Sequence, residues 1–180
     1  MWIALLAAGV VFVAAIVLYN GIVSMRQLTR NAWSDVDVYL KRRAELIPNL
    51  VAAVKGYASH EQAVLEGLAE ARSRAMQINV PSSDKAAAEG IVGERLVRAL
   101  ALAEAYPDLK ASDNFTQLQA SLVDTEKQIA SARQYFNACV RDLNIKIEAF
   151  PSSLIAGAMG VRPMEFFELD TALERDAPRV

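Results

Sequence analysis

Residues 113–150 read DNFTQLQASLVDTEKQIASARQYFNACVRDLNIKIEAF, and this stretch decides the fold class. Apolar positions recur along it at alternating spacings of three and four, which is the pattern of one buried helix face. Ser112 or Asp113 can cap the start of the helix, and Pro151 ends it. Because the pattern exceeds 25 residues, it favours side-by-side helix packing along a seam. The seam consists of Phe115, Leu118, Leu122, Thr125, Ile129, Ala132, Phe136, Cys139, Leu143, Lys146 and Phe150.

Two further runs with helical spacing precede this stretch, and no strand pattern is visible. One run covers 50–75 and the other covers 85–106, with a turn at 81–84 between them. Short loops between helices make neighbours antiparallel. The sequence therefore predicts an all-α protein, an antiparallel helical bundle of three to four long helices.

Pro48 interrupts the amphipathic pattern of the first helix. Proline cannot donate a backbone hydrogen bond and disfavours helical geometry at the residue before it. Residues 24–76 therefore form either one helix kinked at Pro48 and continuous with the preceding segment, or two helices that meet there. The pattern itself does not decide between these alternatives.

The first 25 residues contain no charged side chain. Residues 2–23 are long enough to cross a bilayer, which needs about 20 apolar residues. Trp2 and Tyr19 bracket the most apolar part, as interfacial aromatic residues do, and Phe12 and Leu18 lie between them. A cleaved signal peptide is the alternative, but no basic residue precedes the segment and no A-x-A pattern follows it. We therefore predict an uncleaved transmembrane anchor at residues 1–25.

Basic residues gather after the anchor and are absent before it. Under the positive-inside rule, this asymmetry places the bulk of the chain in the cytoplasm. The same residues are candidates for contacts with lipid headgroups or phosphates, and the alternative is an ordinary solvated helix surface. They are Arg26, Arg30, Lys41, Arg42 and Arg43.

Composition excludes several classes of site. The single Cys139 rules out an intramolecular disulfide framework and a cysteine-based zinc site. The single His60 rules out sites that need two imidazoles. A net charge of −2 argues against nucleic-acid binding, which needs a basic surface. We expect no cofactor, no metal and no catalytic residues.

A few polar residues lie on or beside the helical seams. Arg133, Asn137 and Asn144 follow one face of the last long helix and are candidates for a partner surface or for hydrogen bonds between helices. Glu61 lies at a seam position among apolar residues, where a carboxylate needs a partner. Lys146 is a candidate for that partner, and a structural pair is favoured over a catalytic one.

The composition changes again at Pro151. The last segment contains several prolines and glycines, and from Glu165 onward it carries five acidic groups and two arginines. The predicted organisation is therefore an anchor at 1–25, a helical bundle domain at 26–150, and an irregular acidic C-terminal tail at 151–180.

Several strings in this chain resemble one known family. They include WSDVDV at 33–38, KRRAELIPNLV at 41–51, YPDLK at 106–110 and FPS at 150–152. Together they resemble the LemA family of bacterial membrane proteins over nearly the whole chain. The resemblance implies an N-terminal transmembrane helix, a membrane-tethered helical bundle and the bacterial inner (cytoplasmic) membrane. It implies no enzymatic activity.

Three functions remain open at this point. The leading hypothesis is a membrane-anchored scaffold or adaptor that works through protein–protein contacts, with a second copy of the chain among its candidate partners. The alternative is a protein that organises membranes through anionic lipid. The third is an enzyme, which the residues favour least.

Overall fold

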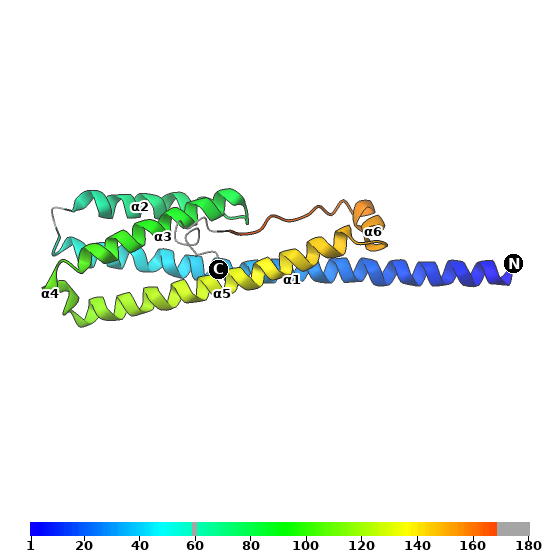
Figure 1. Cartoon of the computed structure of the whole chain (residues 1–180), viewed down its shortest axis with the longest axis horizontal. Helices are drawn as coiled ribbons and strands as arrows, with labels where there is room; N and C mark the ends of the chain where they lie inside the picture. Colours follow the sequence, from blue (N-terminus) through cyan, green and yellow to red (C-terminus); the bar gives the residue numbers. More distant parts are fainter. Residues whose placement is uncertain (59–60, 169–180) are drawn as a thin grey trace, which may run out of the picture. The chain divides into compact units, whose positions relative to one another are not determined.

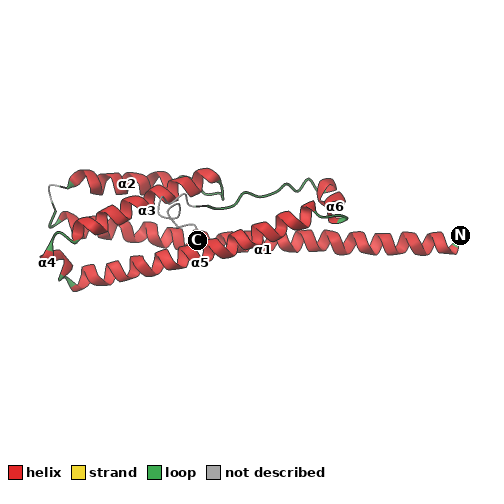
Figure 2. Ribbon diagram, in the orientation of Figure 1, coloured by secondary structure: helices red, strands yellow, loops and turns green. Residues whose placement is uncertain are grey.

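The computed structural model describes residues 1–58 and 61–168, and every regular element in those ranges is a helix (Figures 1 and 2). The all-α prediction is confirmed. His60 and residues 169–180 of the predicted acidic tail lie outside the described residues. The helices are α1 (Trp2–Lys55), α2 (Gln62–Met76), α3 (Ser83–Ala103), α4 (Pro107–Lys110), α5 (Asp113–Glu148) and α6 (Ser152–Ala158).

The chain divides into two compact units. Unit 1 combines residues 1–35 with 132–166, and unit 2 combines the described residues of 36–131 with 167–168. Helices α1 and α5 each contribute residues to both units. The compositional boundaries at residues 25 and 150 differ from this division and stay predictions.

Unit 2 is built around one hydrophobic core. Figure 1 shows α2 and α3 as an antiparallel pair within it. The turn before α3 is fixed by the Ser82 hydroxyl, which accepts a hydrogen bond from the Lys85 backbone N–H at 3.1 Å. The core takes residues from α1 (Ile47, Leu50, Val54), α2 (Leu65, Leu68, Ala71, Ala75), α3 (Val92, Leu96, Ala99, Ala103), α4 (Leu109) and α5 (Phe115, Leu122).

Helix α1 continues through Pro48 to Lys55, so the alternative of two helices that meet at Pro48 is wrong, and a kink there stays a prediction. A proline inside a helix leaves the carbonyl four residues earlier without its usual donor. That carbonyl belongs to Ala44, and the Nε of Arg72 in α2 donates to it at 2.5 Å. A side chain from the neighbouring helix thus replaces the backbone hydrogen bond that Pro48 removes.

The break between the first two helices of unit 2 falls inside a run that the sequence pattern predicts to be one helix. That run covers 50–75, but α1 ends at Lys55 and α2 begins at Gln62. Glu61, expected at a seam position, is exposed, and so is Tyr57 in the same connection. The expected pair between Glu61 and Lys146 is therefore wrong as a buried pair. Folding back here lets α2 bury Leu65 and Leu68 in the same cluster as Leu50.

Unit 1 packs a smaller core from helices α1, α5 and α6. Ile22, Leu143, Ile147 and Ala156 form one buried cluster. Earlier along α5, the Phe136 ring meets Trp33 edge-on with ring centroids 5.4 Å apart. The seam of the last long helix is thus largely confirmed, although α5 ends at Glu148 and Phe150 is exposed.

The turn from α5 into α6 is held by polar groups. The Ser152 hydroxyl donates to the carbonyl of Lys146, one of the last four carbonyls of α5, which lack partners within the helix, and to that of Ala149, directly after the helix. Gly160, at a φ of 64°, then ends α6. The Val161 N–H donates to the Ala156 carbonyl at 3.0 Å, the bond expected for a glycine-terminated helix.

Candidate functional site

The N-terminal part of α1 has the length and composition of a membrane span. Trp2, Phe12 and Tyr19 are exposed there, and Leu18 is half-buried. A continuous exposed apolar surface is unfavourable in water and favourable in a bilayer. These observations agree with the predicted anchor, which they support by length and composition.

The predicted basic residues divide into two groups in the structure. Arg26, Arg30 and Arg42 are exposed. Lys41 is also exposed, and its Nζ lies 2.6 Å from Asp37 Oδ2, one helical turn away. The hydrogen bond and the charge of Asp37 raise the pKa of Lys41. These four side chains are accessible from outside the protein.

The prediction that Arg43 contacts lipid is wrong, because this side chain is only 1% exposed. Its guanidinium forms an ion pair with Glu89 of α3 and also donates to the Glu89 carbonyl at 3.1 Å. Its other nitrogen lies 3.1 Å from Glu126 Oε1 in α5. A buried charge needs such partners because it has lost its water.

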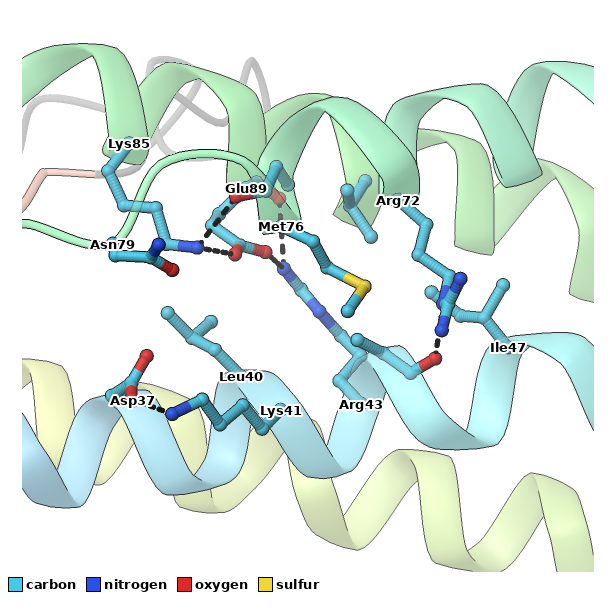
Figure 3. Close-up of a pocket in the computed structure, with 13 residues that line it drawn as sticks. Asp37, Leu40, Lys41, Arg43, Ile47, Arg72, Met76, Asn79, Lys85 and Glu89 are labelled. Carbon is cyan, nitrogen blue, oxygen red and sulfur yellow. Dashed lines mark hydrogen bonds and ion pairs between the residues drawn. The ribbon is translucent and has the colours of Figure 1, made fainter.

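Lys85 completes this buried ionic cluster, which we define as Arg43, Lys85, Glu89 and Glu126. The Lys85 Nζ lies 2.7 Å from Glu89 Oε1 and donates to the Ala75 carbonyl at 2.9 Å (Figure 3). Two cations therefore balance two carboxylates. The cluster joins α1, α3 and α5, and Lys85 adds a link to α2.

A pattern in the sequence could have placed Arg43 inside. It falls on the series Val36, Leu40, Arg43, Ile47 and Leu50, whose spacing alternates four and three. The KRR run obscures this series, because its three basic residues look alike in the sequence. A cation at a seam position is the signal of a buried ion pair, because the seam faces neighbouring helices.

A pocket of about 110 Å³ lies beside the ionic cluster in unit 2. Figure 3 shows Lys41 turned toward Asp37, Arg43 and Lys85 turned toward Glu89, and Arg72 turned toward a backbone oxygen. Each of them already has a partner: Lys41 with Asp37, Arg72 with the Ala44 carbonyl, and Arg43 and Lys85 with Glu89. Such an arrangement suits fixing the register of the helices more than presenting a free acid, base or nucleophile.

The three polar candidates on α5 all lie in unit 1. Arg133 and Asn137 are half-buried, and each takes part in an interaction. The Asn144 side-chain amide donates to the Met164 carbonyl and accepts from the Met164 N–H, both at 2.9 Å. Asn144 therefore binds the segment that follows α6. Contacts of these residues with another protein stay a prediction.

Comparison with known proteins agrees with the family resemblance of the sequence. The sequence model of the LemA family matches residues 32–180. Magnetosome protein MamQ of Magnetospirillum gryphiswaldense is 26% identical over 83% of this chain and 64% of its own length. Protein LemA of Metamycoplasma hominis is 25% identical over 77% of this chain and 64% of its own length. The chain thus spans slightly less than two thirds of these relatives.

Proposed function

The chain belongs to the LemA family, and from this membership we propose that it is a membrane-anchored helical scaffold or adaptor that acts through protein–protein contacts. One observation carries the proposal. A single helix, α1, contains both an exposed apolar segment and, further along, residues buried in a folded core. The chain therefore joins a membrane-type segment to a folded unit through regular structure.

The proposed architecture is an antiparallel bundle carried by the anchor, without a catalytic role. Its support is that the buried charges of unit 2 are paired with one another. The arginine, lysine and glutamate of the ionic cluster hold helices together and are occupied in doing so. The name magnetosome protein describes the relative MamQ in its own organism. The membrane-associated role proposed for this chain is supported by the apolar segment of α1.

We further propose that the anchor lies in the bacterial cytoplasmic membrane with the folded units on the cytoplasmic side. The basic residues Arg26 and Arg30 directly after the span support this orientation. A cysteine introduced at the exposed position Ser131 tests it with a membrane-impermeant maleimide. Labelling is expected only after the membrane is opened. Labelling of intact cells whose wall has been removed would contradict this orientation, because Ser131 would then lie outside the membrane.

The scaffold function is tested by photo-crosslinking the full chain in its native membrane. Crosslinkers at the exposed positions Gln134 and Val97 probe one face of each unit. Reproducible adducts with defined proteins, or with a second copy of the chain, are the expected result. If both positions give only lipid adducts or none, the scaffold proposal fails.

The second candidate is a protein that organises anionic lipid. The exposed arginines Arg26 and Arg30 next to the span favour it, since each basic residue near a charged surface contributes about 1 kcal/mol. The test is the lipid that co-purifies with the full chain in native nanodiscs. Arg26→Gln with Arg30→Gln should reduce anionic lipid if this function holds, whereas Arg98→Gln with Lys127→Gln serves as the control. Equal lipid in both double variants would reject it.

A further inference from the structure

An apolar surface remains on α6 that the anchor does not explain. The thirteen residues 149–161 contain no charged side chain, and they include the whole of α6. Phe150, directly before Pro151 and α6, is 82% exposed, and Leu154, inside α6, is 66% exposed. Large apolar side chains so exposed and so close together mark a contact with something other than water.

The opposite side of α6 is buried against the end of the apolar segment of α1. Ala156 shares a buried cluster with Ile22 of α1, and Ile155 and Met159 pack against that cluster. Closer to the N-terminus of the chain, α6 and α1 border a shallow groove lined by Ala15, Ile16, Tyr19, Ile155, Ala158 and Met159. Helix α6 therefore lies along residues 15–25 of α1.

This placement fixes the depth of α6 if α1 crosses a bilayer. A hydrocarbon core of about 30 Å takes about 20 helical residues, which places its far boundary near Ile22 when Trp2 marks the other side. Residues 15–22 then cover about the last 10 Å of the hydrocarbon. Helix α6 lies beside these residues, at the depth where interfacial helices bury their apolar faces.

The charges around α6 are arranged consistently with that depth. Glu148 and Arg162 bracket the uncharged stretch, and the first charge on α1 is Arg26, about one turn beyond Ile22. The Nζ of Lys146 in α5 lies beside Gly21, next to the boundary near Ile22. Charged groups thus gather where the headgroup region begins. A protein partner would not require two uncharged stretches to coincide in this way, whereas a bilayer does because buried charge is costly there.

We propose that α6 is a second membrane element, which inserts Phe150 and Leu154 into the lipid of one leaflet beside the end of the span. The inference rests on the proposed anchoring of α1 in a membrane. Acyl chains are the occupant of the exposed apolar surface, and the two elements together fix unit 1 against the bilayer. A single spanning helix would be free to rotate and tilt, and α6 removes that freedom.

The test uses the full chain in lipid vesicles with an environment-sensitive fluorophore on single introduced cysteines. Phe150→Cys and Leu154→Cys report on α6, Phe12→Cys reports on the span, and Gln134→Cys is the matched exposed control on α5. Native Cys139 is buried and is left unlabelled under folding conditions. Lipids that carry a quencher on the acyl chain then measure contact with the hydrocarbon.

The expected result is a blue-shifted emission and clear quenching at Phe150 and Leu154, as at the more deeply placed Phe12, with no quenching at Gln134. Quenching at Phe12 alone would overturn the inference and leave the anchor intact. A blue shift at Leu154 without lipid quenching would also overturn it, since protein would then cover α6. Absence of quenching at all four positions would reject the anchor and α6 together.

Discussion

The two units bury polar groups of different kinds. Every charged side chain that is buried among residues 1–58 and 61–168 lies in unit 2, namely Arg43, Lys85 and Glu89. In the described part of unit 1 the buried polar residues are Thr29 and Ser152, whose hydroxyls bond backbone carbonyls. Both units satisfy their buried polar atoms, but unit 1 does so without charge.

The difference follows from what surrounds each unit. A buried ion pair is tolerated where nearby water and neighbouring charges reduce its desolvation cost. That cost rises when the surroundings are more extensively apolar, as in a lipid bilayer. Unit 1 contains the apolar segment of α1 and the uncharged α6, which we propose to lie in lipid. Hydroxyl groups and the Asn144 amide can be satisfied there at a lower desolvation cost than ions.

The largest expected effect breaks the apolar core of unit 1. Phe136→Ala removes a fully buried ring and its contact with Trp33, which should lower the free energy of unfolding by about 3–5 kcal/mol. Hydrogen exchange measured by mass spectrometry in detergent should show faster exchange in residues 132–166. Gln134→Ala, at an exposed neighbour, is the control. Equal acceleration in α2 and α3 would mean that the units do not respond separately.

The next prediction concerns the ionic cluster of unit 2. Glu89→Gln leaves two buried cations with one carboxylate, and a broken buried pair costs about 3–5 kcal/mol. Glu126→Gln is the matched control, because Glu126 is 39% exposed and contacts Arg43 alone in this cluster. Its loss should cost about 1 kcal/mol or less. Urea unfolding of the two variants gives the comparison, and equal losses would contradict it.

A smaller effect is expected at the carbonyl that Pro48 leaves unpaired. Arg72→Met removes the donor to the Ala44 carbonyl and should cost about 1–3 kcal/mol. In a Pro48→Ala background the backbone N–H is restored, so the same Arg72→Met change should cost less. A double-mutant cycle on unfolding free energies measures this coupling. A coupling energy of zero would show that Arg72 does not replace the bond.

The uncharged polar contact of unit 1 should have a local effect. Asn144→Ala removes both hydrogen bonds to Met164, at a cost of about 1 kcal/mol for groups that are only half-buried. Amide exchange in residues 161–168 should accelerate while exchange in α2 and α3 is unchanged. Asn114→Ala, at an exposed position, provides the comparison. Unchanged exchange in 161–168 would show that this contact does not hold the segment.

The smallest effect is expected at the exposed pair of Lys41 and Asp37. Asp37 raises the pKa of Lys41 above its ordinary value of 10.5. Any stability from the pair is therefore present below that pH and is lost as the pH rises beyond it. Lys41→Ala should leave the thermal midpoint unchanged near neutral pH, since exposed pairs contribute little. A clear fall in the thermal midpoint near neutral pH would contradict this prediction, because Lys41 would then contribute to stability as the buried cations Arg43 and Lys85 do.

Much of the fold could be predicted because its signal is periodic. The seam of α5 was readable over ten turns, and the uncharged first 25 residues indicated the apolar segment directly. The KRR run was harder, because three adjacent basic residues look alike in a sequence while consecutive helical positions point in different directions. Lys41 and Arg42 face outward and Arg43 faces inward, and the seam spacing of Arg43 was the available signal.

The sequence by itself determined which segments are helical, which segment is apolar enough for a membrane, and which family the chain resembles, because these depend on local composition and spacing. The tertiary structure decided where the first helix ends, why Pro48 is tolerated, which carboxylates meet Arg43 and where α6 lies. Each of these depends on groups far apart in the chain, such as Arg72 with Ala44 or Ile22 with Ala156. Periodicity identifies the face of a helix that is buried, but only the packed structure identifies what that face contacts.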